Sequence, residues 1–426
     1  MAASQSKPVY GLLGRKLGHS YSPRIHAMLG DYEYRLHEVQ PDDVAAFIRE
    51  GDFAGLNVTM PYKETVMDLC DKLTDAAKKI GNVNTIVRRE DGTLLGDNTD
   101  YYGFSHLLNV GHMNVTDRKV VVLGTGGAAK TVHAVLTDRG ASEIVMISRT
   151  GENNYENIAQ HYDARFIVNT TPVGMFPNCP DSPIDLEPFA RTGELREGRA
   201  DGLFGVVDVV YNPARTGLML QAEKLGVPHI SGLPMLVAQA KAASELWQHK
   251  QISNEIVDEI VEKITFEEGN IVIIGMPSGG KSTIGSLLAK QLGREFVDID
   301  DYIPEAAGKS IADIFCGRWR RSVSRHRDAG YGRCVQAQRF WFIACGGGVV
   351  TKARNYDLLH QNGIVLLLKR PLELLVSDRT AHVHHKGHSC SCARPWPEIW
   401  TPGRYRGFQR RRPMIVVGRA LEKLQK

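Results

Sequence analysis

Short apolar runs alternate with stretches of helical periodicity along most of this chain. Each run is rich in valine, isoleucine and leucine and ends at a glycine or a polar residue. The runs lie at 9–13, 120–123, 143–147, 166–168, 206–210 and 271–274. Continuous apolar runs of this length, separated by helical stretches, are typical of buried strands in α/β proteins. The pattern therefore predicts an α/β fold.

One amphipathic stretch divides this pattern. Between 252 and 264, apolar side chains recur on one face of a predicted helix. They are Ile252, Ile256, Val257, Ile260, Val261 and Ile264. A chain of 426 residues is also too long for one hydrophobic core. We therefore expect this helix to join two parts of the protein.

Composition adds little, but the distribution of charge is uneven. The hydrophobic fraction of 42% and the charged fraction of 23% are typical of a soluble globular protein. The sequence has no secretory signal and no run that could span a bilayer, and its seven cysteines suggest reduced thiols, so we expect a cytoplasmic protein. The net charge is +4; the windows 316–342 and 377–413 contribute +6 each, so the rest of the chain carries −8.

A strand that ends near Val58 leads into a turn with an unusual set of polar side chains. The turn presents the amide of Asn57, the hydroxyl of Thr59 and the ammonium of Lys63, and Pro61 ends the strand. A lysine in such a turn can give or take a proton if burial or neighbouring groups lower its pKa. Taken alone, Lys63 is more simply a solvated surface lysine.

Other polar turns leave two interpretations open. Ser20 and Ser22 precede a helix predicted to open at Pro23, where they would bind a substrate carboxylate or where Ser22 would cap the helix. Asn84 leads into a strand and Asp100 leads into a helix, so both also fit ordinary turn and capping chemistry.

The strand at 120–123 runs into a glycine-rich loop and then a helical pattern. This is the context in which G-x-G-x-x-A binds a dinucleotide. Gly124 permits the tight turn, Gly126 lets the backbone approach a pyrophosphate, and Ala129 permits close helix packing. The cofactor-binding residues expected here are Gly124, Thr125, Gly126, Gly127 and Ala128.

The end of the next strand, 143–147, indicates which dinucleotide is bound. An acidic residue at this place would bind the ribose 2′-hydroxyl of NAD, whereas Arg149 can stack on adenine and pair with a 2′-phosphate. The sequence therefore favours NADP, although Glu152 close by weakens the inference.

Together, and in this order across about residues 8–250, these features resemble shikimate dehydrogenase. The motifs are Ser20-x-Ser22, Asn57-Val58-Thr59-Met60-Pro61-Tyr62-Lys63, Asn82-Val83-Asn84-Thr85, Asn98-Thr99-Asp100-x-x-Gly103, the glycine loop, and Gly232 with Gln239. The resemblance implies that Lys63 and Asp100 form the catalytic pair in the reduction of 3-dehydroshikimate to shikimate. It implies substrate contacts from Ser20, Ser22, Thr59, Asn84, Tyr211 and Gln239, with Val209 and Gly232 beside the nicotinamide.

The resemblance also implies a two-lobed dehydrogenase. Its substrate-binding catalytic domain would comprise 1–105, completed by about 232–265, and its Rossmann NADP-binding domain would comprise 106–231. Asn153 and Asn154 stand where the family often has a second basic residue, so selectivity for NADP over NAD is expected to be looser. A quinate-using dehydrogenase is a further alternative, disfavoured because Ser20 and Ser22 keep both small hydroxyls.

A second strand-and-glycine pattern begins at Asn270. The strand at 271–274 leads into Gly275-Met276-Pro277-Ser278-Gly279-Gly280-Lys281-Ser282-Thr283, a complete match to the P-loop G-x-x-x-x-G-K-S. In such a loop the backbone amides wrap a phosphate, Lys281 reaches the β and γ groups, and Ser282 ligates Mg²⁺. ATP and Mg²⁺ are therefore expected ligands, bound by Ser278, Gly279, Gly280, Lys281, Ser282 and Thr283.

Three later segments, 295–303, 308–315 and 344–351, resemble shikimate kinase. The resemblance implies a P-loop kinase-like domain at 266–426. In it, Asp298 would have a magnesium role and Asp300 would contact a substrate hydroxyl. Gly346, Gly347 and Gly348 would contact the substrate through their backbone. The product of the first part would then be the substrate of the second.

The two basic windows depart from the kinase pattern. The family has a Phe-Arg helix after Phe315 and a lid arginine after Ser377, whereas this chain has Cys316–Ser322 and a stretch rich in His and Cys. Neither a zinc module nor a nucleic-acid-binding motif matches their spacing, and we expect no nucleic-acid or membrane partner. Our preferred interpretation is translation in a wrong reading frame, which would impair the kinase. The alternative is a dehydrogenase whose C-terminal half only binds nucleotide or is structural.

Overall fold

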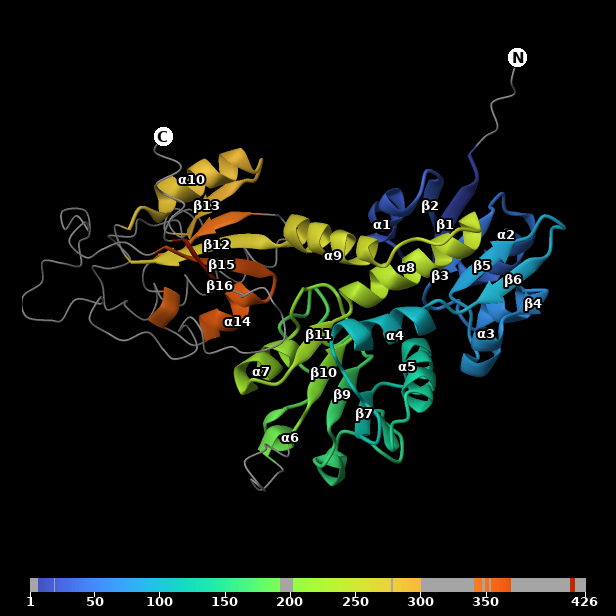
Figure 1. The fold of residues 1–426 in the computed structure, drawn as a ribbon, viewed down its shortest axis with the longest axis horizontal. Coiled ribbons are helices and arrows are strands. Elements are labelled where there is room, and N and C mark those ends of the chain that lie inside the picture. Colours follow the sequence, from blue (N-terminus) through green and yellow to red (C-terminus); the bar gives the residue numbers. More distant parts are fainter. Residues whose placement is uncertain are drawn as a thin grey trace, which may run out of the picture. The chain divides into compact units, whose positions relative to one another are not determined.

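Among the residues that it describes, the computed structural model of the chain has three β-sheets (Figure 1). It describes residues 7–18, 20–191, 202–276, 279–299, 341–346, 349–351, 354–368 and 414–417. These residues divide into two compact units. The first comprises 1–172, 183–211 and 227–264, and the second comprises 173–182, 212–226 and 265–426. Strands and helices alternate in both units, so the predicted α/β class is confirmed.

The first sheet of the first unit is mixed and has the strand order β2-β1-β3-β5-β6-β4. Its strands are β1 (Val9–Gly14), β2 (Glu33–Glu38), β3 (Gly55–Val58), β4 (Lys72–Leu73), β5 (Thr85–Arg88) and β6 (Leu94–Asp97). Its helices are α1 (Ser22–Leu29), α2 (Val44–Glu50) and α3 (Asp75–Ile80), with 3-10 turns at Pro41–Asp43 and Thr65–Leu69. Leu13, Ile48 and Leu56 are fully buried in its core. These buried side chains form a hydrophobic core against this sheet.

The second sheet of this unit is parallel and has the order β11-β10-β9-β7-β8. Its strands are β7 (Lys119–Leu123), β8 (Glu143–Ile147), β9 (Phe166–Asn169), β10 (Gly205–Asp208) and β11 (His229–Ser231). The helices here are α4 (Asp100–Val110), α5 (Gly127–Asp138) and α6 (Glu187–Arg191), with a 3-10 turn at Ile158–His161. The apolar runs predicted as strands form four of its five strands, because residues buried on both faces of a parallel sheet read as continuous apolar segments.

Helix α8 (Leu233–Gln248) packs against both α4 and the first sheet (Figure 1). A Cβ atom added at Gly103 of α4 would lie 2.7 Å from the carbonyl oxygen of Met235, so the two helices are in close backbone contact. At the other end of α8, the Trp247 ring stacks on Tyr10, and its Nε1 donates to the carbonyl of Ile86 over 3.1 Å. Helix α8 thereby joins elements that are far apart in sequence.

The predicted joining helix is α9 (Glu255–Glu268). Val257, Ile260 and Ile264 are buried against α1 and α8, as the periodicity of this stretch predicts. Among the described residues, no helix is long and apolar enough to cross a membrane.

The second unit is built on a parallel sheet with the order β13-β14-β12-β15-β16. Its strands are β12 (Asn270–Gly275), β13 (Phe296–Asp298), β14 (Phe342–Ala344), β15 (Gly363–Leu368) and β16 (Met414–Val417). Its helices are α7 (Gly217–Leu225), α10 (Lys281–Gln291) and α14 (Arg354–His360), with a 3-10 turn at Val349–Thr351. Buried apolar residues of β12, β14 and β15 form its core.

The contact at Gly103 leads to a prediction about stability. We expect Gly103→Val to destabilise the protein by about 1–3 kcal/mol, because a branched side chain in a tightly packed contact forces backbone shifts. This corresponds to a fall of about 2–4 °C in the unfolding midpoint for each kcal/mol. Asn109→Val is the matched control, because Asn109 lies on the exposed side of the same helix. Asparagine and valine have similar helix propensities, so this substitution should change stability little. Equal midpoints for the two variants in thermal unfolding would contradict the prediction.

Candidate active site

Strand directions bring the polar turns of the first sheet to one edge. Strands β1 and β3 are parallel, so the turns that follow Gly14 and Val58 leave the same edge. Strand β5 runs antiparallel to β3 and to β6, with Thr85 opposite both Asn57 and Asp97. Asn84, which precedes β5, and Asn98, which follows β6, therefore lie at this same edge. We call this end of the strands, with Thr59, Lys63, Asn84 and Asn98, the polar edge.

Lys63 and Asp100 meet at this edge. The Lys63 Nζ donates to Asp100 Oδ2, and the two side chains are 18% and 11% exposed. Asp100 is the first residue of α4, where a carboxylate is favoured by the helix dipole. Lys63 is thus a largely buried, paired lysine, and the surface-lysine alternative is wrong.

The two serines are also close together. Ser20 Oγ accepts from the backbone N–H of Ser22 over 3.2 Å, and Ser22 is 6% exposed. Helix α1 begins at Ser22 and has Tyr21 as its N-cap, so Ser22 is the first helical residue and does not cap the helix. Pro23 lies in the first turn, as expected for a helix start.

The remaining predicted substrate residues come from separate elements. The Tyr211 ring contacts that of Tyr21, with ring centres 5.3 Å apart, and burial raises the pKa of Tyr211. Gln239, on α8, is buried, and its Nε2 donates to the carbonyl of Leu236 over 2.8 Å. Thr59 is partly exposed in the turn that leads to Lys63. The structure thus brings Tyr211 next to the Ser20–Ser22 segment.

The glycine loop between β7 and α5 has the backbone that a dinucleotide requires. Gly124 has a φ of +109°, which L side chains rarely adopt, and a Cβ at Gly126 would meet no atom within 4 Å. Open space in front of Gly126 and the N-terminus of α5 behind it fit a pyrophosphate group. Thr125 is exposed in this loop, and Ala128 follows in the first turn of α5.

The glycine loop lies beside the polar edge of the first sheet. A Cβ at Gly127 would lie 3.9 Å from Lys63 Cδ, and Asn82 Nδ2 donates to the Gly127 carbonyl over 3.3 Å. The first turn of the dinucleotide-binding helix is therefore adjacent to the paired lysine.

Val209 and Gly232, the two residues expected beside the nicotinamide, are in direct contact. A Cβ at Gly232 would lie 2.0 Å from the Val209 carbonyl oxygen.

The turn after β8 holds Arg149 at the surface. Ser148 Oγ accepts from the N–H of Gly151 over 2.7 Å, and Asn154 Oδ1 accepts from the N–H of Glu156 over 2.9 Å. Asn153 Oδ1 faces His161 Nε2 at 3.1 Å. The two asparagines at the position of the family's second basic residue are thus engaged in the structure of the turn itself.

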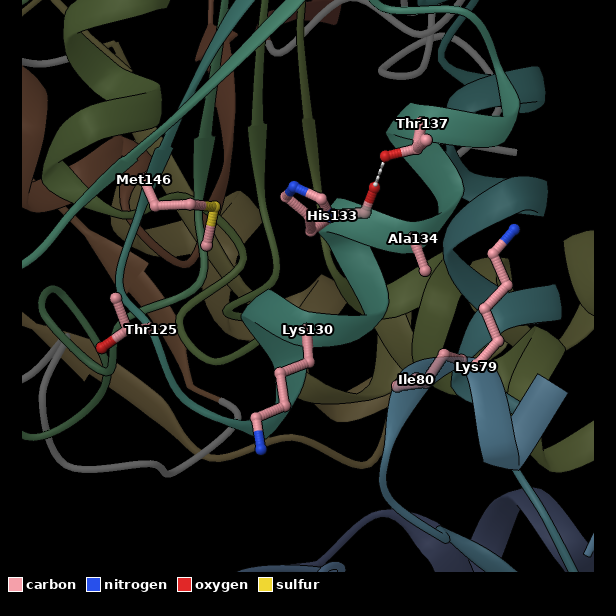
Figure 2. A pocket seen from close by; sticks show the side chains of 8 residues that line it. All are labelled: Lys79, Ile80, Thr125, Lys130, His133, Ala134, Thr137 and Met146. Atoms are coloured by element: carbon pink, nitrogen blue, oxygen red, sulfur yellow. Dashed lines mark hydrogen bonds between the residues drawn. The ribbon is translucent and has the colours of Figure 1, made fainter.

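A pocket of about 370 Å³ borders the glycine loop and α5 (Figure 2). Its lining residues come from α3, the loop, α5 and β8 and are Lys79, Ile80, Thr125, Lys130, His133, Ala134, Thr137 and Met146. Lys130 pairs with Glu64 at 2.6 Å, and Lys79 pairs with Asp138. These ion pairs link the first sheet's segments to α5. They join residues far apart in sequence, so local sequence patterns do not predict them.

The described part of the P-loop also has its expected backbone. Gly280 has a φ of +89° at the N-terminus of α10, and Lys281 Nζ donates to the carbonyls of Gly275 and Met276 at 3.2 and 2.8 Å. Ser282 Oγ donates to Asp298 Oδ2 over 2.5 Å, so the two expected magnesium ligands are in contact. Thr283 is exposed on α10.

The expected kinase site lies only partly within the described residues. Gly346 is buried after β14. Ser278, Asp300, Gly347 and Gly348 lie outside the described residues. So do the two basic windows, 316–342 and 377–413, apart from Trp341 and Phe342.

Comparison with known proteins gives a consistent result. Residues 12–86 match the family model of the shikimate dehydrogenase substrate binding domain. Residues 277–387 match the family model of shikimate kinase, a range that includes the first basic window and the start of the second. A shikimate dehydrogenase (NADP(+)) from Clostridium beijerinckii is 37% identical over 267 residues, which cover 58% of this chain and 94% of that relative.

Solved structures are similar to the same part of the chain. Shikimate 5-dehydrogenase from Thermus thermophilus, in complex with NADP(H) and shikimate, has a TM-score of 0.53 and 28% identity, and covers 60% of this chain and 99% of its own. Quinate dehydrogenase from Corynebacterium glutamicum, in complex with NAD, has a TM-score of 0.53 and 25% identity, and covers 61% of this chain and 100% of its own. The chain therefore belongs to the shikimate dehydrogenase family, and a segment that matches shikimate kinase follows its dehydrogenase part.

Proposed function

We propose that the dehydrogenase part reduces 3-dehydroshikimate to shikimate with NADPH. The observation that carries this proposal is the Lys63–Asp100 pair beside the first turn of the dinucleotide-binding helix. A proton donor close to the cofactor site can serve a carbonyl that receives hydride from the cofactor. NADPH, when bound, supplies that hydride.

Lys63 has the role of the proton donor in this proposal. Its ammonium gives one proton to the carbonyl oxygen as that oxygen gains negative charge, and the neutral amine is then reprotonated from solvent. Asp100 holds the ammonium in place and stabilises its charge through the ion pair. The partial burial of both groups strengthens this interaction relative to an exposed pair.

The substrate is a carboxylate that carries several ring hydroxyls, and the polar edge offers groups for each. We assign the carboxylate to Ser20 and Ser22, next to the N-terminus of α1. We assign the ring hydroxyls to Thr59, Asn84, Tyr211 and Gln239. Quinate is the competing substrate, and the likeness to a solved quinate dehydrogenase is the observation in its favour.

The cofactor is proposed to be NADP rather than NAD. The support is Arg149 at the end of β8, the family names that specify NADP(+), and the absence of an acid at 148–150. Gly124–Ala128 hold the pyrophosphate, and Val209 and Gly232 border the nicotinamide.

The domain boundaries are proposed from the sheets. The substrate-binding domain comprises 1–105, with α8 and the start of α9 (about 232–265) completing it, and the Rossmann domain comprises 106–231. Support comes from the two separate sheets and from the packing of α8 on the first. The kinase-like domain comprises 266–426. A cytoplasmic location is also proposed, with 3-dehydroshikimate and shikimate as small-molecule partners, in line with the shikimate dehydrogenases among the chain's relatives.

The kinase-like domain is proposed to be impaired. Its P-loop and the Ser282–Asp298 contact favour ATP and Mg²⁺ binding, and Asp300 and Gly346–Gly348 are assigned to shikimate. The sequence, however, lacks the Phe-Arg helix and the lid arginine of the family, and arginines that stabilise a transferring phosphoryl group are worth about 10³–10⁵ in rate. The alternative is a dehydrogenase whose C-terminal half has no catalytic activity and only binds nucleotide or is structural.

Replacement of Lys63 tests the proton-donor role. We expect Lys63→Ala to lower kcat for 3-dehydroshikimate by about 10²–10⁴-fold, because general acid catalysis contributes about this much. NADPH binding, measured by fluorescence titration, is expected to stay at the wild-type value. Lys78→Ala is the control, since Lys78 is an exposed lysine (61%) on helix α3 of the same unit. A near-normal kcat for Lys63→Ala would refute the assigned role.

Replacement of Arg149 tests cofactor selectivity. We expect Arg149→Ala to lower kcat/KM for NADPH by about 10- to 100-fold, because charge-assisted hydrogen bonds are worth about 1.5–3 kcal/mol. The kcat/KM for NADH should change little and serves as the internal control. An equal fall for both cofactors, or equal wild-type values for the two, would overturn the assignment.

The kinase proposal is tested on the whole chain. We expect ATP-dependent phosphorylation of shikimate to run far below the rate of a working kinase, with dehydrogenase turnover as the control for folding. Lys281→Ala identifies any phosphorylation that comes from the P-loop. Robust turnover that disappears in Lys281→Ala would contradict both the impairment and the reading-frame interpretation.

A further inference from the structure

Five side chains beneath the polar edge, four of them buried, have no role in the proposed reaction. The buried ones are His26 on α1, Asn57 on β3, Thr85 on β5 and Thr99 before α4, and the fifth is the partly buried Tyr34 on β2. Hydrogen bonds join them to Asn84, the residue assigned to a ring hydroxyl. We propose that this chain of hydrogen bonds fixes the side-chain amide of Asn84 so that its nitrogen, and not its oxygen, faces the substrate.

The direction of the chain is set at a backbone group. The N–H of Thr99 donates to Asn84 Oδ1 over 2.7 Å, and a backbone N–H can only donate. The hydroxyls of Thr99 and Thr85 lie 3.2 and 3.1 Å from the same oxygen. The two hydroxyls also face each other, so one donates to the other and the second donates to Asn84 Oδ1. Asn84 Oδ1 therefore accepts from the Thr99 N–H and from one hydroxyl, and no described residue accepts from its Nδ2.

This direction is transmitted through Thr85 to Asn57. The Thr85 hydroxyl also faces that of Thr99 at 2.9 Å, so its single proton is used toward Thr99 or Asn84. Thr85 Oγ1 can then only accept from Asn57 Nδ2, at 3.4 Å. Asn57 thus presents its nitrogen to Thr85 and its oxygen to the opposite side.

His26 matches the amide oxygen of Asn57. Complete burial lowers the pKa of His26 to about 3, so the ring is neutral and has one donor and one acceptor nitrogen. Its Nε2 lies 3.0 Å from Asn57 Oδ1 and is the donor, while Nδ1 accepts from the Tyr32 hydroxyl at 2.8 Å. The Tyr34 hydroxyl also donates to Asn57 Oδ1, at 2.9 Å.

Every link therefore agrees with one orientation of the Asn84 amide. A reversed Asn84 would place its NH₂ group against the N–H of Thr99, which leaves a buried donor without an acceptor. The substrate group at this point must accept a hydrogen bond, as a hydroxyl or carbonyl oxygen does. His26, Asn57 and Thr85 are positioning residues: they act on the substrate through Asn84 alone.

The inference rests on the proposed function and is tested by a pair of variants at Thr85. Thr85→Val removes the hydroxyl but keeps the shape, and Thr85→Ser keeps the hydroxyl. We expect Thr85→Val to raise KM for 3-dehydroshikimate about tenfold with kcat within about twofold, because a contact made equally in the ground and transition states affects KM. KM for NADPH should not change. Thr85→Ser should restore KM to within about twofold of the wild type.

Three outcomes distinguish this inference from its alternatives. An unchanged KM for 3-dehydroshikimate in Thr85→Val would overturn the inference. This holds also if kcat falls, because a fall in kcat with KM unchanged indicates only a loss of folded enzyme. If Thr85→Val does not fold, Asn57→Asp carries the same test: it keeps the acceptor for His26 and replaces the donor to Thr85 with a carboxyl oxygen. A wild-type chain that does not reduce 3-dehydroshikimate would instead refute the proposed function.

Discussion

The assembly of Asn84, Lys63 and Asp100 at one edge of the first sheet depends on the antiparallel course of β5 between β3 and β6. If all strands of the first sheet were parallel, Asn84 would leave from the opposite edge and the site could not form. The reversal returns the chain to the edge at which β3 ends, and α4 then begins at Asp100 itself. Because α4 leads directly to the second sheet, the acid that holds Lys63 also begins the connection to the dinucleotide-binding sheet.

Close helix packing supports this connection. Gly103 allows α4 to touch α8, and α8 reaches the first sheet through Trp247. Gln239 lies on the same helix, one turn after Met235, so the packing that stabilises the two sheets also positions an assigned substrate residue. The buried polar residues beneath the edge add direction to this arrangement: their hydrogen bonds select one orientation of an amide that packing alone would leave ambiguous.

Much of the fold and of the site followed from the sequence, because strands, turns and glycine loops are local signals. The apolar runs, the turn at Lys63 and the two glycine loops lie where the pattern predicted them. The N-cap at Ser22 was wrong, since Tyr21 has the capping position and the helix begins one residue earlier than expected. The pairing of His26 with Asn57, 31 residues apart, and of Lys130 with Glu64 was not predictable, because it depends on how distant elements pack.

A crystal structure with NADP and shikimate bound tests the central claim most directly. If Lys63 transfers the proton, its Nζ lies about 2.7–3.2 Å from the oxygen of the carbon that faces the nicotinamide, and it keeps its contact with Asp100. A complex in which Lys63 points away from that oxygen, with another proton donor in its place, would contradict the account.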